Sequence, residues 1–144
     1  MAAHRRPADL SWRLSQYTEH ASDFAHYPGV GTHSAGEISY LTIALVGEAG
    51  ELANDLKKAL RDEKLGDESR CLTPERRDNM LGELGDVLWY ASQLAGALGS
   101  SLDEVAKTNV AKLEFRYNEK ADAGDPTAIG ICKRRYLRRK SERG

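Results

Sequence analysis

The sequence predicts an all-α fold, and three observations lead to this prediction. Apolar residues recur at spacings of three and four over several stretches, which is the period of an amphipathic helix. No stretch sustains the alternation expected of a β-strand. Signals that start and stop helices separate the periodic stretches, such as Thr73-Pro74 before one of them and Gly99-Ser100 after it. We therefore expect four main helices with short connections, packed as a four-helix bundle-like core.

The periodic stretches give approximate bounds for the four helices. The first is expected from about residue 10 to 25 and the second from 36 to 62. A polar segment, residues 63–72, separates the second from a third helix that spans about 74 to 98. The fourth is expected from Leu102 to about residue 120. The domain prediction is thus a disordered N-terminus (1–9), one helical domain (10–120) and an irregular tail (121–144).

Composition narrows the class of protein. At 144 residues and 40% hydrophobic content, the chain is long enough for one domain with a core. It has no apolar run long enough for a membrane span and no apolar segment of the signal-peptide type near its start. Cys71 and Cys132 have no metal-type spacing and fit a reducing compartment. A cytoplasmic location is the resulting expectation.

Charge is distributed unevenly along the chain. Residues 133–144 contain seven basic residues against Glu142, a net charge of +6, which leaves −7 for residues 1–132 of a total of −1. A basic tail of this kind is either a solvated segment or a site for nucleic acid or for the acidic face of a partner. The sequence leaves both interpretations open.

Two acid pairs stand out in the expected second and third helices. They are Glu48 with Glu51 and Glu83 with Asp86, each separated by three positions. Residues three apart lie on one face of a helix, where like charges repel by a few tenths of a kcal/mol. A bound cation would turn this repulsion into an attraction.

The apolar register places two of these acids towards the core. Glu48 occupies an inward position between Leu45 and Leu52, and Glu83 does so between Met80 and Val87. An inward carboxylate without a partner is costly. Four carboxylates with no histidine at ligand spacing predict an oxygen-only site for Mg²⁺, or alternatively for Mn²⁺.

A magnesium site of this kind commonly binds a substrate through its phosphates, which require basic partners. The candidates are Lys57, Lys58, Lys112 and Arg116. For the two lysines, which lie near the end of the second helix, a favourable interaction with the helix dipole is the alternative role.

Three segments together resemble a known family. They are residues 47–58 (GEAGELANDLKK), 81–90 (LGELGDVLWY) and 109–117 (NVAKLEFRY). In this order they are similar to MazG-like members of the all-α NTP pyrophosphatase superfamily, which also includes dimeric dUTPases and dCTP pyrophosphatases. The resemblance covers roughly residues 17–117. The segment 63–72 makes the interval between the acid pairs somewhat longer than is usual in that family, and the basic tail lies outside the shared region.

The resemblance implies hydrolysis of a nucleoside triphosphate, with a dNTP expected, to the monophosphate and pyrophosphate, for cleaning or control of the nucleotide pool. It implies that Mg²⁺ is held by Glu48, Glu51, Glu83 and Asp86. Glu51 is the candidate for orienting or deprotonating the attacking water, although any of the four acids could serve. Residues expected at the phosphates and sugar are Lys57, Lys58, Tyr90, Asn109, Lys112 and Arg116.

Base recognition in similar enzymes draws on the first helix, so His20, Phe24 and Tyr27 are the candidates for it. Core packing is the alternative for Tyr90, and a surface or loop role for His20. Relatives form dimers or tetramers, and a homo-oligomer is expected here too. The alternative to an enzyme is a non-catalytic helical module that senses a nucleotide or binds a protein or nucleic acid.

Overall fold

The computed structural model describes residues 13–62 and 71–141, and these residues form α-helices and no strand. The helices are α1 (Leu14–Ser22), α2 (Ala35–Asp62), α3 (Pro74–Ala97), α4 (Leu102–Asp122) and α5 (Pro126–Ser141). The all-α prediction is confirmed, and the first four helices lie close to their expected bounds. The expectations for residues 1–9, and for most of the 63–72 segment, fall outside the described residues.

The prediction of an irregular tail from residue 121 onwards was wrong. Helix α4 continues to Asp122, and Gly124 then adopts a left-handed conformation, with φ of 86°. Asp125 accepts hydrogen bonds from the backbone N–H groups of Thr127 (2.8 Å) and Ala128 (3.2 Å), which is how an N-cap residue starts a helix. Asp125-Pro126 therefore opens α5 in the same way that Thr73-Pro74 opens α3.

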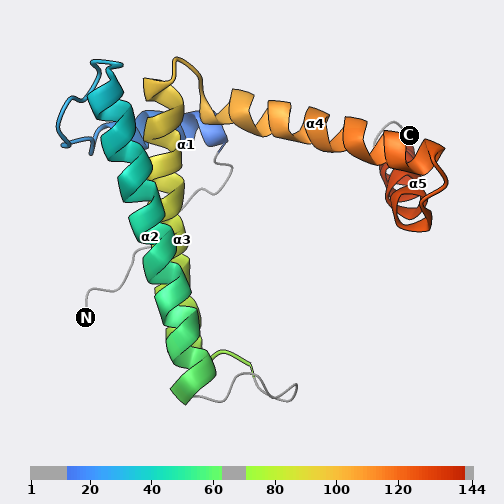
Figure 1. Cartoon of the computed structure of the whole chain (residues 1–144), viewed down its shortest axis with the longest axis horizontal. Coiled ribbons are helices and arrows are strands. Elements are labelled where there is room, and N and C mark those ends of the chain that lie inside the picture. The colour runs from blue at the N-terminus through green and yellow to red at the C-terminus, as the bar shows by residue number, and fades with distance from the viewer. Residues whose placement is uncertain (1–12, 63–70, 142–144) are drawn as a thin grey trace. The chain divides into compact units, whose positions relative to one another are not determined.

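The chain divides into two compact units, residues 1–102 and 103–144. In the first unit α2 and α3 lie side by side, and α1 packs against α3 (Figure 1). The apolar residues buried in this unit are mostly small, and small side chains allow helices to approach closely. They are Ala21, Leu41, Ala59, Ala95, Ala97 and Leu102.

Within the second unit, one buried residue and one cysteine join α5 to the end of α4. Ala128 is 1% exposed. The thiol of Cys132 donates to the backbone carbonyl of Tyr117 (3.7 Å) and to the side-chain oxygen of Asn118 (3.3 Å). Among the helices that the structure describes, none has the length and apolar character needed to cross a membrane.

The start of α2 depends on a buried glutamate that the sequence analysis did not single out. The hydroxyl of Ser34 accepts a hydrogen bond from the backbone N–H of Glu37 (3.2 Å), as in a capping box. The Glu37 carboxylate in turn accepts from the backbone N–H groups of His33 (2.7 Å) and Gly31 (2.9 Å). Gly29, Gly31 and His33 all have positive φ, at 82°, 74° and 52°. Glu37 therefore holds a loop whose backbone would otherwise be unfavourable.

These hydrogen bonds decide the ionisation of Glu37. Burial by itself would raise the pKa of this carboxyl group, but the donors at Gly31, His33, Tyr27 and Thr32 outweigh burial and hold the pKa below its usual 4.5. The folded protein therefore binds this proton less tightly than the unfolded chain does. Glu37 stabilises the fold fully above about pH 4.5, and this stabilisation is lost as pH falls through the lowered pKa.

We predict that Glu37→Gln lowers the unfolding temperature at pH 7, because an amide cannot accept all of these bonds. The gap between the variant and the native protein should close as pH falls below about 4.5, where the native carboxylate becomes protonated. Circular dichroism melts from pH 7 to pH 3 measure both effects. Glu19→Gln, at an exposed acid on α1, is the matched control. A gap of constant size over the whole pH range would contradict the prediction.

Candidate functional site

Two neighbouring helices bring three carboxylates together. Glu48 on α2 and Glu83 and Asp86 on α3 each offer an oxygen, and these oxygens all lie within 4.8 Å of one another. Glu48 and Glu83 are half-buried and Asp86 is exposed. Glu83 and Asp86 share a face of α3 because they are three residues apart. The packing of α2 against α3 supplies the third carboxylate.

The charges of this cluster disfavour its ionised state. Burial raises the pKa of Glu48, and the negative charges of Asp86, Glu83 and Glu51 raise it further. A divalent cation would remove both penalties, since it supplies the charge that the carboxylates lack. The donor set consists of oxygen atoms alone, which suits Mg²⁺ or Mn²⁺ better than a softer metal. The residues therefore fit the predicted metal.

Glu51 differs from the other three predicted ligands. It lies one turn beyond Glu48 on α2, its side chain is exposed, and the compact group of three does not include it. Its charge nevertheless acts on Glu48, where it raises the pKa. An exposed carboxylate at the edge of the cluster is open to water. Its roles as a fourth metal ligand and as the group that orients the attacking water remain predictions.

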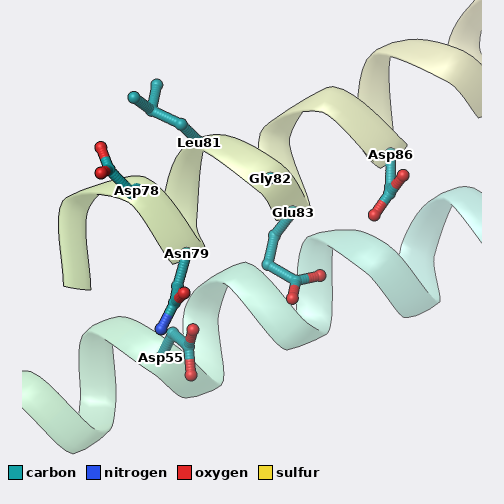
Figure 2. A pocket seen from close by; sticks show the side chains of 7 residues that line it. All are labelled: Asp55, Asp78, Asn79, Leu81, Gly82, Glu83 and Asp86. Atoms are coloured by element: carbon teal, nitrogen blue, oxygen red, sulfur yellow. The ribbon is translucent and has the colours of Figure 1, made fainter. Parts of the chain in front are cut away.

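A groove of about 870 Å³ runs along α3 beside two of the acids. In Figure 2, Glu83 and Asp86 point towards α2, and Asn79 lies next to Asp55 of α2, whereas Asp78 and Leu81 point away. The lining is formed by Asp55, Asp78, Asn79, Leu81, Gly82, Glu83 and Asp86. This groove is therefore a polar one that extends from the acid cluster towards the far end of α2.

Asp55, which lines this groove, pairs with two basic residues. It accepts from the Lys58 ammonium at 3.2 Å and lies 3.7 Å from a guanidinium nitrogen of Arg76 on α3. Lys57 is exposed on the same helix. The sequence analysis did not select Asp55 or Arg76, although Asp55 lies seven residues after Glu48 and thus on the same face of α2. A role in phosphate binding remains a prediction for both Lys57 and Lys58.

Tyrosine side chains on α1 and α3 lie close enough to the acids to be affected by their charge. Burial raises the pKa of Tyr90, and Tyr40, Glu48 and Asp86 raise it further. Burial also raises the pKa of Tyr17 on α1, with a smaller contribution from the Asp86 charge. Neither Tyr17 nor Tyr40 was among the candidate residues of the sequence analysis, although Tyr40 precedes Glu48 by about two helical turns.

The three candidates for base recognition have different surroundings. Phe24 is 72% exposed, and His20 is exposed with its Nδ1 2.9 Å from the backbone oxygen of Gln16. Tyr27 donates to Glu37 at 3.2 Å and stacks on Tyr40, with ring centroids 5.8 Å apart. Contact with a base remains a prediction for all three.

Asn109, Lys112 and Arg116 are exposed on one helix, α4, at spacings of three and four. They therefore share a face, as the sequence predicted. This helix belongs to the second compact unit. Their approach to the acid cluster remains a prediction.

Comparison with known proteins shows the family. Residues 37–120 match the model of the MazG nucleotide pyrophosphohydrolase domain. The chain is 48% identical to the Gene 37 protein of Mycobacterium phage L5 over 97 residues, which cover 67% of this chain and 81% of the phage protein. It is 35% identical over 77 residues to the uncharacterized protein YvdC of Bacillus subtilis (strain 168), covering 51% and 69% of the two chains. No solved structure gives a significant match. The chain therefore belongs to the MazG nucleotide pyrophosphohydrolase family.

Proposed function

We propose that this protein hydrolyses a nucleoside triphosphate, with a dNTP as the expected class, to the monophosphate and pyrophosphate, and that it does so with Mg²⁺. One observation carries the proposal: three carboxylates from two packed helices lie within 4.8 Å of one another beside a polar groove. Membership of the MazG family supports the same reaction. Cleaning or control of the nucleotide pool would be its purpose.

The acids would hold the metal, with Glu48, Glu83 and Asp86 as the core of the site and Glu51 at its edge. A bound divalent ion supplies positive charge that neutralises the phosphates and makes a nearby water more acidic. Mn²⁺ would fit the same oxygen donors.

Water is the nucleophile in the proposed reaction. Its oxygen attacks the α-phosphorus in line, the bond from that phosphorus to the bridging oxygen of the β-phosphate breaks, and pyrophosphate leaves. Glu51 would orient this water and take its proton. Asp55 lines the polar groove and pairs with Lys58, which would contact the phosphates. The α4 residues Lys112 and Arg116 are the other proposed phosphate contacts.

A homo-dimer or homo-tetramer is part of the proposal. Large apolar side chains are exposed along α2 and α3, at helical spacings on each helix. They are Ile43, Val46, Leu60, Leu81 and Leu84, with exposed fractions between 48% and 73%. Burying such a face against a second copy would remove apolar surface from water. Light scattering coupled to size exclusion measures the assembly state directly.

The reaction is tested by release of pyrophosphate from a panel of canonical and modified NTPs and dNTPs, with Mg²⁺ and with chelator. We expect stoichiometric pyrophosphate and monophosphate only in the presence of the metal. The relative rates across the panel would name the base and sugar. A folded protein that binds Mg²⁺ yet releases no pyrophosphate from any nucleotide would favour the non-catalytic binding module instead.

We predict that Glu51→Gln and Asp86→Asn each lower turnover at least about 100-fold, because each removes a charge at the reacting centre. Helical content by circular dichroism should stay near that of the native protein. Asp78→Asn is the control, since this acid also lines the groove but points away from the cluster (Figure 2). Full activity in either site variant would refute the assignment.

We also predict that Glu48→Gln stabilises the metal-free protein while it weakens Mg²⁺ binding. The pKa of Glu48 is raised in the fold, so the folded state holds this proton more tightly than the unfolded chain does. Ionisation above about pH 4.5 therefore costs stability, and the amide avoids that cost. In chelator at pH 7 the variant should melt a few degrees higher. In saturating Mg²⁺ the order should reverse, which thermal melts with and without metal would reveal.

A further inference from the structure

Glu37 is a buried carboxylate that does not belong to the acid cluster of Glu48, Glu83 and Asp86. It is 2% exposed and lies in the first turn of α2. Besides the two backbone donors of the loop, it accepts hydrogen bonds from the hydroxyls of Tyr27 (3.2 Å) and Thr32 (3.4 Å). A charged group buried this deeply is tolerated because its oxygens are satisfied. What these bonds fix is the position of the chain from residue 27 to 33.

Tyr27 is the side chain that Glu37 holds. The ring of Tyr27 stacks on Tyr40 with centroids 5.8 Å apart and planes 15° from parallel, and meets Trp89 edge-on at 6.1 Å. Trp89 is itself fixed by its indole N–H, which donates to the backbone oxygen of Ala21 at 3.0 Å. Burial, together with the bond to Glu37, raises the pKa of Tyr27 to about 12, so the phenol remains a donor at neutral pH.

From this stack the contacts continue to the acids. Tyr90 lies four residues after Asp86 and therefore on the same face of α3. Burial raises the pKa of Tyr90, and nearby Tyr40, Glu48 and Asp86 raise it further. Trp89 packs edge-on against Tyr90 as well, at 4.8 Å. Tyr40 retains 40% of its surface exposed, so it is both held from one side and open to a ligand on another. The contacts thus run from Glu37 to Tyr27, and from Tyr27 to Tyr40 on one side and through Trp89 to Tyr90 on the other. Tyr90 lies about one helical turn after Asp86 of the acid cluster.

We propose that Tyr40 contacts the nucleoside part of the substrate beside Tyr90, and that Glu37 is a positioning residue that keeps Tyr40 in place through Tyr27. The proposal rests on the function proposed above. Phenol rings and hydroxyls suit a sugar and a base, which offer a flat face and hydrogen-bonding groups. Phosphates are bound best where there is positive charge. The cations Lys58 and Arg76 lie at Asp55, which lines the groove seven residues after Glu48 on α2, whereas Tyr40 precedes Glu48 by eight. The nucleoside therefore lies on the tyrosine side of the acids.

This division gives a selective test, because inorganic tripolyphosphate has the phosphates of the substrate and no nucleoside. Binding of Mg²⁺–tripolyphosphate and of each of five dNTPs (dATP, dCTP, dGTP, dTTP and dUTP) is measured by calorimetry on the full chain. Glu37→Gln should weaken binding of the preferred dNTP about tenfold and leave that of tripolyphosphate unchanged. In turnover, KM should rise while kcat at saturation stays within about twofold. Glu19→Gln is the matched acid-to-amide control, and it should change the affinity for neither ligand.

Two further variants keep the proposal open to refutation if Glu37→Gln folds poorly. Tyr40→Phe keeps the stack on Tyr27 and removes only the hydroxyl next to Tyr90, whereas Tyr27→Phe removes only the donor to Glu37. Both variants should bind the dNTP more weakly and bind tripolyphosphate with unchanged affinity. The larger loss of dNTP affinity is expected for Tyr40→Phe. Unchanged dNTP affinity in both variants would overturn the proposal. An equal loss for both ligands would also overturn it, because that result indicates general damage to the site.

The same measurements separate the two proposals. A native protein that releases no pyrophosphate contradicts the proposed reaction, yet calorimetry still decides the role of Tyr40. If the native protein hydrolyses dNTPs and the variants have an unaltered KM, the proposed reaction is supported and the inference about Tyr40 and Glu37 is refuted.

Discussion

Electrostatic repulsion among carboxylates on two packed helices is the constraint on which the site depends. Glu48 on α2 would be ionised at little cost if it stood alone in water, but the acids of α3 are held within 4.8 Å of it. The helices cannot move apart to relieve this repulsion, because Leu41 and the buried alanines fix their packing. Free energy is therefore stored where a divalent cation can release it. In the proposed metal site, the affinity for the ion and the cost of the metal-free state would have the same origin.

A second buried acid in the same helix shows that surroundings, not residue type, decide the role of a glutamate. Glu37 and Glu48 lie three turns apart on α2, and their pKa values move in opposite directions. Backbone N–H donors surround Glu37, so its charge is satisfied within the fold and stabilises it. Other carboxylates surround Glu48, so its charge is satisfied only by a ligand. One acid holds the structure that positions tyrosines, and the other is available for binding.

Several features could be predicted from local sequence because their causes are local. The bounds of α2 and α3 follow from apolar periodicity and from the Thr73-Pro74 start signal, and the inward placement of Glu48 and Glu83 follows from the same register. Helix α5 was not predicted, although Asp125-Pro126 is a start signal equivalent to Thr73-Pro74. The Ser34 N-cap, whose hydroxyl accepts from the backbone N–H of Glu37, was also legible in the sequence and was not used.

By itself the sequence determined the helical class and the inward placement of Glu48 and Glu83, and it predicted an oxygen-only metal site, because residue spacing and donor type do not depend on long-range contacts. Tertiary structure decided which carboxylates meet. It selected Glu48, Glu83 and Asp86 as the compact group and left Glu51 at the edge. It also brought Tyr17 of α1 within the influence of Asp86 on α3, and Tyr40 of α2 close to Tyr90 of α3. Such juxtapositions depend on how helices pack against one another, and helical periodicity does not specify that packing.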